Sequence, residues 1–337
     1  MASLKIPTFS EPEFPSVSPH EEQIEAYTRD YAERVGMTAT PAGRRRLDAG
    51  YGRFVAWTYP AAPFEDLGIC AEWLFVTFVL DDLHTLPAYD SPDAWSPHHR
   101  RLMTLIETGR HEQVTRPTAF TRSVADLSER TRRKVSAAFY ERFAHHLDMF
   151  FQGFSRESEN RRIGTIPELG NFLETRRLSV GMEFGFDLVE FSQGFEVPEA
   201  VYTSPGYQSL VAAAADIVAW QNDVHSLKLD IQRGDLHNLV LVQQKATGSD
   251  LDQAREMACD QIRQRIDDFT SAEHRLLAAL AETDLTEPDQ ARILDVVAGM
   301  RQWANGCLHW YRTTTRYTIP ASSAEADREH QHLEAIF

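Results

Sequence analysis

Residues 71–85 read AEWLFVTFVLDDLHT, a very apolar stretch that ends in two adjacent aspartates. We expect it to belong to a helix over residues 65–85. A helix that is hydrophobic on nearly every side is buried rather than exposed on a surface. The chain contains no run of 18 or more apolar residues, so no transmembrane helix is expected. The stretch therefore predicts the central helix of an α-helical core.

Segments on both sides of this helix repeat apolar residues at helical spacing. They are expected at 21–35, 119–153 (ending near Gly153), 167–193, 207–232, 250–281 and 288–317. Val and Ile occur singly within these patterns, so we expect no sheet and an all-α bundle of about ten to twelve helices. The expected organisation is an extended N-terminal arm at 1–20, one helical domain at 21–318 and a polar tail at 319–337.

The composition narrows the possible partners. The 337 residues carry a formal net charge of −16, which disfavours nucleic acid as a partner. The N-terminus lacks the basic and apolar regions of a secretory signal. Cys70, Cys259 and Cys307 are far apart and form no CxxC pair, so neither a zinc site nor a disulfide framework is indicated. We expect a soluble protein of the reducing cytoplasm.

The two aspartates, Asp81 and Asp82, form the first candidate site. An acidic pair at the end of a buried helix is costly unless a cation neutralises it. Mg²⁺ suits this role, because it prefers oxygen ligands and shares them with substrate phosphates. Phe78 and Phe75 precede Asp81 at helical spacing, so an aromatic wall is expected to lead to a metal-binding rim. The alternative is a solvent-facing Asp pair above ordinary core phenylalanines.

A second candidate site lies in WQNDVHSLKLD at 220–230. Asn222, Ser226 and Asp230 are spaced four residues apart, which places them roughly 6 Å apart along one helical face. An amide, a hydroxyl and a carboxylate give an all-oxygen set that suits Mg²⁺ bound also to diphosphate. Asp223 points elsewhere and is expected to orient its neighbours. The alternative, an exposed polar face, is disfavoured by the apolar AAAADIVAW just upstream.

Five features together resemble the bacterial and fungal class I terpene synthases. DDLHT resembles their aspartate-rich motif, and NDVHSLKLD resembles their NSE motif. FLETRRLSVG at 172–181 resembles the segment with their pyrophosphate-sensing arginine, and GDLHNLV at 234–240 the stretch after the NSE motif. Arg316-Tyr317, in WYRTTTRYTIP, resembles their RY pair. The features span residues 75–317, and they imply a single-domain helical bundle around a central cavity.

The resemblance implies a role for each matching metal-site residue. Asp81 would hold one or two Mg²⁺ ions, with Asp82 supporting it through hydrogen bonds or salt links. Asn222, Ser226 and Asp230 would hold another Mg²⁺ ion. Three ions are expected once diphosphate is bound.

The resemblance also assigns the diphosphate contacts. Arg176, 46 residues before Asn222, would bind the diphosphate, with Arg177 as the alternative. Arg316 would donate to the diphosphate, and Tyr317 would close the site beside it. Asp81, Arg176, Arg316 and Tyr317 are therefore the expected catalytic residues, and Asn222 would also lie against the diphosphate.

A helix break in the family supplies a backbone carbonyl that helps to trigger ionisation. Ser179, Val180 and Gly181 fall at this position. The NSE acid is Asp230 in place of the usual Glu. Lys228 lies one residue earlier than the basic residue that often precedes that acid, and it is the least favoured diphosphate ligand.

The aspartate-rich motif departs from the family pattern, since Thr85 and Leu86 follow where another acid is usual. Pro87 is expected to end the helix, so Asp90 is not expected to substitute. Asp81 would then carry most of the coordination from this helix.

The expected activity is Mg²⁺-dependent ionisation of a linear isoprenoid diphosphate, followed by carbocation cyclisation and release of diphosphate. Farnesyl diphosphate is favoured over geranylgeranyl diphosphate. Aromatic faces would stabilise the cation. The candidate pocket-lining residues, each of which could instead be ordinary core, are Trp57, Phe75, Phe78, Val180, Phe184 and Trp303.

Three other functions remain open from the sequence. A chain-elongating prenyltransferase would share the fold but is expected to carry two aspartate-rich motifs. An inactive homologue is suggested by Thr85. A helical interaction protein would explain the helices but not the two oxygen-ligand clusters. A homodimer is possible, and neither membrane insertion nor nucleic acid binding is expected.

Overall fold

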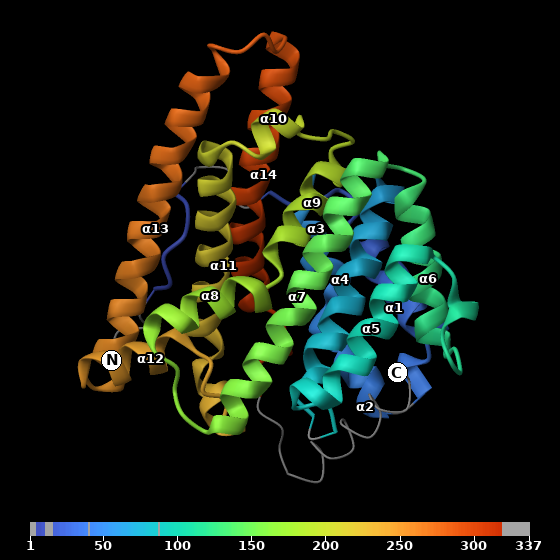
Figure 1. Ribbon diagram of the computed structural model, residues 1–337, viewed down its shortest axis with the longest axis vertical. Coiled ribbons are helices and arrows are strands. Elements are labelled where there is room, and N and C mark those ends of the chain that lie inside the picture. Colours follow the sequence, from blue (N-terminus) through green and yellow to red (C-terminus); the bar gives the residue numbers. More distant parts are fainter. Residues whose placement is uncertain (1–4, 11–15, 40, 87, 319–337) are drawn as a thin grey trace.

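The computed structural model describes residues 5–10, 16–39, 41–86 and 88–318, apart from the side chains of residues 41, 42 and 45. Over these residues the protein is helical, and no strand is present among them (Figure 1). Twelve α-helices in the described part of the chain have eight or more residues, which confirms the predicted all-α bundle.

The first half of the chain contributes α1 (Glu21–Arg34), α2 (Pro41–Arg46), α3 (Tyr51–Thr58), α4 (Phe64–His84), α5 (Pro92–Thr108), α6 (Ala119–Arg132) and α7 (Ala137–Ile163). The second half contributes α8 (Leu169–Ser179), α9 (Met182–Ser192), α10 (Glu199–Tyr202), α11 (Pro205–Arg233), α12 (Leu239–Thr247), α13 (Leu251–Leu280) and α14 (Glu287–Tyr311). Short 3₁₀ turns lie at Met37–Ala39, Leu47–Ala49 and His111–Gln113. In Figure 1, α13 and α14 are joined by a loop at the top of the view.

Long periodic segments match the observed helices closely. The predicted helix at 65–85 is α4, that at 207–232 is α11, and that at 250–281 is α13. Ser204 caps α11 by accepting a hydrogen bond from the Tyr207 amide, and Pro205 occupies its first turn. Gly234, with φ of 72°, ends α11 in the left-handed conformation.

The segment at 119–153 is largely helical, as predicted, but its predicted end near Gly153 is wrong. The chain forms α6 and α7 there, and Ser136 caps α7 by accepting from the Phe139 amide. Gly153 lies inside α7 and does not end it. Its role is close packing, because a Cβ atom there would lie 2.6 Å from the backbone nitrogen of Ser179 on α8.

The segment at 167–193 is also two helices, α8 and α9, separated at Val180 and Gly181. Gly181 has φ of 66°, which favours glycine, and a Cβ atom there would collide with the rings of Phe184 and Phe150. The last predicted helix, 288–317, ends at Tyr311, so the Arg316-Tyr317 pair lies beyond α14.

Several helices were not predicted from the sequence. Among them are α3, which is short, and α5, whose pattern is interrupted by Pro97. Ser91 nevertheless caps α5 by accepting from the Ala94 amide. Both helices bury one apolar face, and the short length of α3 and Pro97 in α5 hid this pattern in the sequence.

The N-terminal arm lies against the last long helices where it is described. The Phe9 amide donates to Asn305 Oδ1 at 3.2 Å, and Gln221 Nε2 donates to the Pro7 carbonyl at 2.8 Å. The rest of the arm, Pro87 and the tail at 319–337 lie outside the described residues, so the division into arm, domain and tail stays a prediction.

The structure also describes the state of the cysteines and the hydrophobic character of the helices. Cys70, Cys259 and Cys307 are free and buried. In the described part of the chain, no helix has the length and apolar character needed to cross a membrane.

Candidate active site

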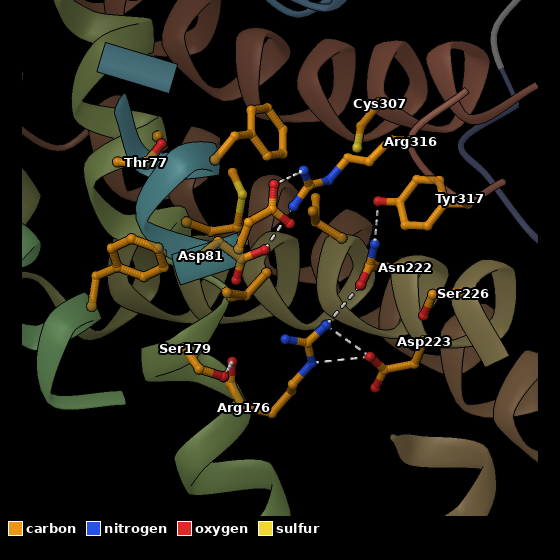
Figure 2. Close-up of a pocket in the computed structure, with 18 of the residues that line it drawn as sticks. Thr77, Asp81, Arg176, Ser179, Asn222, Asp223, Ser226, Cys307, Arg316 and Tyr317 are labelled. Atoms are coloured by element: carbon orange, nitrogen blue, oxygen red, sulfur yellow. Dashed lines mark hydrogen bonds and ion pairs between the residues drawn. The ribbon is translucent and has the colours of Figure 1, made fainter. Parts of the chain in front are cut away.

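A cavity opens between the ends of α4, α8 and α11 and the segment that follows α14. It encloses about 1280 Å³, including the space at its mouth. Most of the predicted metal and diphosphate residues line it, and Figure 2 shows their side chains converging from these elements. A concave site with a few convergent polar groups is typical of a small-molecule binding site.

Asp81 and Asp82 form one rim of the mouth, at the C-terminal end of α4. Arg316 bridges them, with Nη2 at 2.8 Å from Asp81 and Nη1 at 2.9 Å from Asp82. Arg46, from α2, also donates to Asp82. Asp81 is the more accessible carboxylate, since its side chain is 42% exposed and that of Asp82 is 13% exposed. This arrangement matches the expectation that Asp82 acts through salt links.

Asn222 lies on the opposite rim, on α11. Its Nδ2 donates to the hydroxyls of Tyr317 at 2.8 Å and Tyr311 at 3.1 Å, while its Oδ1 accepts from Arg176 Nη2 at 3.0 Å (Figure 2). The RY pair therefore reaches both rims, since Arg316 holds α4 and Tyr317 holds α11.

Ser226 and Asp230 continue the α11 rim. Ser226 Oγ donates to Asp230 Oδ2 at 2.6 Å, and Asn238 Nδ2 donates to the same oxygen at 2.8 Å. Burial raises the pKa of Asp230 to about 7, and nearby Asp235 and Asp223 act in the same direction. Asp230 is thus a buried carboxyl whose hydrogen-bond donors are neutral groups.

Arg176, the predicted diphosphate ligand, extends from α8 to α11. Its Nε donates to Asp223 Oδ1 at 3.0 Å, and Asp223 Oδ2 accepts from the Leu239 amide at 3.0 Å. Asp223 therefore orients its neighbours, but the expectation that it points elsewhere is wrong, because it lines the cavity and shares Arg176 with Asn222. The alternative sensor, Arg177, instead donates twice to buried Asp216 at 2.7 Å and does not line the cavity.

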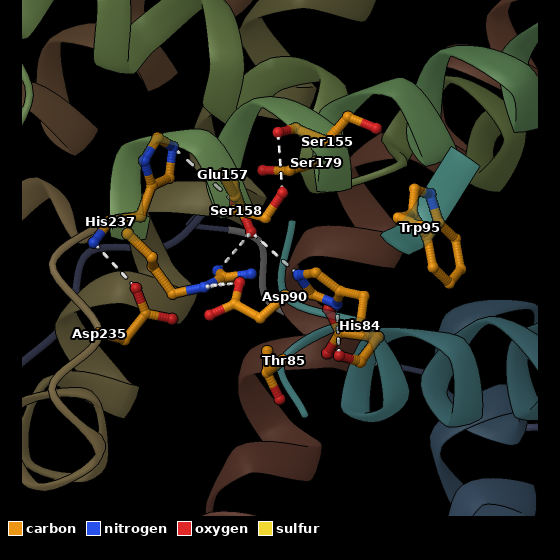
Figure 3. Close-up of polar contacts among 12 residues, drawn as sticks. His84, Thr85, Asp90, Trp95, Ser155, Glu157, Ser158, Ser179, Asp235 and His237 are labelled. Atoms are coloured by element: carbon orange, nitrogen blue, oxygen red, sulfur yellow. Dashed lines mark hydrogen bonds and ion pairs between the residues drawn. The ribbon is translucent and has the colours of Figure 1, made fainter. Parts of the chain in front are cut away.

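A polar cluster around Glu157 supports this side of the cavity (Figure 3). His84 Nε2 lies 3.3 Å from Glu157 Oε2, His237 Nε2 lies 3.8 Å from Oε1, and Arg176 Nη1 lies 4.0 Å from Oε1. Burial alone would raise the pKa of Glu157, but His237, His84 and Arg176 hold it well below its usual value. The carboxylate is therefore charged and contributes to orienting Arg176.

The break between α8 and α9 opens onto the same cavity. Ser179, Val180 and Gly181 line it, and the Val180 amide donates to the Arg176 carbonyl at 3.0 Å. The predicted break is thus next to the predicted sensor.

The departures in the aspartate-rich motif are visible in the structure. Thr85 lines the mouth and is exposed, whereas Leu86 is buried. Asp90 accepts from Arg161 Nε at 2.8 Å, and it does not line the cavity. As predicted, Asp90 does not take the place of a third acid.

Aromatic side chains form the inner wall. The predicted residues Phe78, Phe184, Trp303 and Val180 line the cavity. Sequence reasoning missed four further aromatic residues of the cavity lining: Phe54, Phe150, Trp310 and Tyr311. Trp310 packs 4.8 Å from Phe54 between ring centroids, and helical periodicity could not have separated it from ordinary core.

Two predicted lining residues lie elsewhere. Phe75 is fully buried behind the wall, packed edge-to-face on Tyr31 and Tyr51 at 5.7 and 5.6 Å. Trp57 stacks on His309 at 3.9 Å and donates to Glu21. Neither lines the cavity.

The prediction for Lys228 is also wrong. Its side chain is exposed and absent from the cavity lining. It lies two residues after Ser226, and positions two apart face different sides of a helix.

The family model described as "Terpene synthase family 2, C-terminal metal binding" matches residues 72–268, more than half of the chain. The chain belongs to this terpene synthase family. The matched range contains Asp81, Asp82, Arg176 and the Asn222–Asp230 set. The protein is therefore a class I terpene synthase, a carbon–oxygen lyase acting on phosphates.

Individual relatives agree with this assignment. Germacrene A synthase of Nostoc punctiforme is 27% identical over 90% of this chain and 93% of its own. The (+)-T-muurolol synthase of Roseiflexus castenholzii is 27% identical over 92% of this chain and 93% of its own. The fold matches that of germacradien-4-ol synthase from Streptomyces citricolor, with a TM-score of 0.81 at 24% identity over 91% of this chain and 99% of that one.

The terpene synthase site has the donor chemistry for a bound divalent cation. Among the described residues no cluster of three His, Cys, Asp or Glu side chains could hold a metal ion. The α11 rim instead combines an amide, a hydroxyl and a carboxyl whose pKa is raised mainly by burial. Hard oxygen donors of this kind fit Mg²⁺ better than a transition metal.

Proposed function

We propose that this enzyme uses Mg²⁺ to ionise farnesyl diphosphate and cyclises the resulting cation to a sesquiterpene. The observation that carries the proposal is that two oxygen-donor rims, each linked to an arginine, share the mouth of one cavity with an aromatic wall. The T-muurolol relative, whose name specifies cyclisation of (2E,6E)-farnesyl diphosphate, supports the choice of substrate.

The residues of the two rims would divide the first step between them. Asp81 on α4, and Asn222, Ser226 and Asp230 on α11, would hold Mg²⁺, with three ions expected. Bound Mg²⁺ would supply Lewis-acid stabilisation of the departing diphosphate. Arg176 and Arg316 would donate charge-assisted hydrogen bonds to the diphosphate oxygens. Tyr317 would cover the site beside Arg316.

The aromatic wall would control the second step. An allylic cation reacts with water, so the cavity must exclude solvent while the rings close. The faces of Phe78, Phe184 and Trp303 would each stabilise the cation by about 1–2 kcal/mol when desolvated. Arg316 already lies 4.7 Å from the centroid of the Phe78 ring, so the diphosphate ligand and the wall are adjacent.

Other substrates and products remain testable. Geranylgeranyl diphosphate would give a diterpene in the same chemistry. A chain-elongating prenyltransferase is disfavoured because the second rim is an Asn/Ser/Asp set rather than a second aspartate-rich motif. An inactive homologue is the remaining alternative, because Leu86 is buried where a further acid is usual. A homodimer and a cytoplasmic location stay predictions.

The decisive experiment is to incubate the protein with Mg²⁺ and, separately, geranyl, farnesyl and geranylgeranyl diphosphate, and to analyse the extracts by GC–MS. A cyclic C15 product from farnesyl diphosphate is expected, and it should disappear with EDTA and in Asp81→Ala. A cyclic product from geranylgeranyl diphosphate alone would replace the sesquiterpene assignment. No product from any substrate would contradict the proposed catalysis.

A further inference from the structure

Arg46 is a guanidinium at the α4 rim that no motif anticipated. It is the last residue of α2 and donates to Asp82, and both side chains are largely buried, at 14% and 13% exposure. Asp82 and Arg316 line the cavity, but Arg46 does not. Arg46 therefore contacts the site through Asp82 rather than through the space that a substrate would occupy.

Four charged side chains contact one another at this rim. Two carboxylates, Asp81 and Asp82, face two guanidiniums, Arg46 and Arg316. Arg316 is shared, because one of its nitrogens contacts each carboxylate, at 2.8 and 2.9 Å. Arg46 and Arg316 donate to the same oxygen of Asp82, Oδ2, and Arg46 does not line the cavity.

Ligand binding would change which of these four side chains pair with one another. Under the proposed function, Arg316 must turn from the carboxylates to the diphosphate, and Asp81 must become available to Mg²⁺. Without Arg46, Asp82 would then be a largely buried carboxylate without a counter-ion, and such a group is costly. It would hold Arg316 back from the diphosphate, or it would move towards the metal.

We propose that Arg46 is a positioning residue that remains on Asp82 as its counter-ion while Arg316 moves from Asp82 to the diphosphate. This inference rests on the proposed function of the site. Arg46 keeps the cost of releasing Arg316 low, and it keeps Asp82 out of the metal's coordination.

Removing Arg46 has two consequences of opposite sign. Arg316 becomes the sole guanidinium shared by two carboxylates, so the diphosphate competes less well for it. At the same time the rim carries one more net negative charge, and so it attracts a divalent cation more strongly in the absence of diphosphate. A simple loss of structure would weaken both kinds of binding.

The test is isothermal titration calorimetry on Arg46→Gln with two probes, Mg²⁺ alone and inorganic diphosphate in excess Mg²⁺. We expect diphosphate affinity to fall by about tenfold or more, as for loss of a charged hydrogen-bond partner, and Mg²⁺ affinity to rise. Arg46→Lys keeps the charge and should recover most of the diphosphate affinity. In turnover, KM for the substrate should rise more than kcat falls.

Arg44→Gln is the matched control, since Arg44 is an exposed residue of the same short helix and donates to the Thr38 carbonyl at 2.6 Å. It should behave as the wild type with both probes. Equal effects of the Arg44 and Arg46 changes would assign the result to α2 folding and overturn the inference, as would weakening of both ligands in Arg46→Gln. Wild-type affinities in Arg46→Gln would also overturn it. Failure of the wild-type protein to bind diphosphate would instead reject the proposed function.

Discussion

Arg142 and Arg316 are both buried arginines that bridge two carboxylates, but their surroundings differ. Arg142, on α7, contacts Asp187 at 3.0 Å and Glu190 at 2.8 Å, both on α9 and both only 2% exposed. Arg316 contacts Asp81, which is 42% exposed, and Asp82. The first group can only hold α7 to α9, whereas the second can exchange a partner for a ligand. Similar ion pairs thus serve stability in one region and binding in the other.

We call the first group the closed cluster: Arg142, His146, Asp187, Glu190 and Tyr202. His146 Nδ1 lies 2.6 Å from Asp187 Oδ2, and the Tyr202 ring lies 4.0 Å from the Arg142 guanidinium. None of these side chains lines the active-site cavity. Changes there should therefore alter folding and leave the chemistry of the folded enzyme intact.

Asp187→Ala should give the largest effect on stability. It leaves His146 without its buried acceptor and Arg142 with Glu190 alone, so the free energy of unfolding should fall by about 3–5 kcal/mol. Urea denaturation followed by circular dichroism measures this loss. Activity per folded molecule below the transition should stay close to wild type. A catalytic defect at unchanged stability would remove the contrast between the two regions.

Asn222→Ala should instead lower activity much more than stability. It removes one proposed metal ligand and the acceptor of Arg176 Nη2, so kcat/KM should fall by about a hundredfold, with little change in thermal stability. Steady-state release of diphosphate gives the rate. Lys228→Ala, on the exposed side of the same helix, is the control and should match wild type. A large loss in the control would restore Lys228 as a ligand.

Mg²⁺ and inorganic diphosphate, added together, should stabilise the protein by binding at the active-site cavity only. Ligand at 100 times its Kd adds about 2.7 kcal/mol to the free energy of unfolding. Differential scanning calorimetry should show a rise in Tm for the wild type and for Asp187→Asn, but not for Asn222→Ala. An equal rise in all three proteins would place the bound ligand elsewhere.

Phe78→Leu and Phe75→Leu test which aromatic rings of α4 contact the reacting cation. Phe78 lines the cavity, so its loss should remove a cation–π contribution of about 1–2 kcal/mol and change the product ratio. Phe75 lies behind the wall, and its change should leave the product ratio intact. GC–MS of the two product mixtures distinguishes them. Identical changes of product ratio in both variants would mean that the aromatic wall affects the products only through packing and not through contact with the cation.

Glu190→Gln should give the smallest effect, and it depends on pH. Burial raises the pKa of Glu190 from 4.5 to about 7, with Arg142 opposing this change. The folded state then holds the proton more tightly than the unfolded state. The stability that this provides is present below pH 4.5 and is lost as the pH rises to about 7.

The variant should therefore lose less stability than the wild type between these pH values, by on the order of 1 kcal/mol. Tm measured across the range provides the comparison. A steeper decline in the variant would contradict the sign. The charged or titratable groups facing Glu190 are Arg142, Asp187, Tyr202 and Tyr207.

The chain's local patterns predicted much of the site, because several of its residues share one helix. Asn222, Ser226 and Asp230 follow the helical repeat, so their common face could be derived from spacing. Asp81 could be placed because it follows a continuous apolar helix. Arg176 and Arg316 required the family resemblance, since only the folded chain brings them to these rims.

Predictions failed where small rotations or distant contacts decide the outcome. Phe75 and Phe78 differ by about 60° around α4, which is enough to place one ring behind the other. Arg46 belongs to a short helix without a distinctive pattern, and its contact with Asp82 joins separate parts of the chain. The break between α6 and α7 within 119–153 was not predicted, because it depends on the Ser136 cap rather than on hydrophobic periodicity.

Gly153 has a practical consequence for redesign of the product spectrum. It has no side chain and does not line the cavity, so a library restricted to lining residues would omit it. Yet any larger residue there would push against Ser179 and shift the end of α8, which carries Arg176. A substitution at Gly153 would thus change how the leaving group and the cation align, although the residue lies outside the cavity. The same position would explain a loss of activity in a variant with many substitutions whose lining residues are intact.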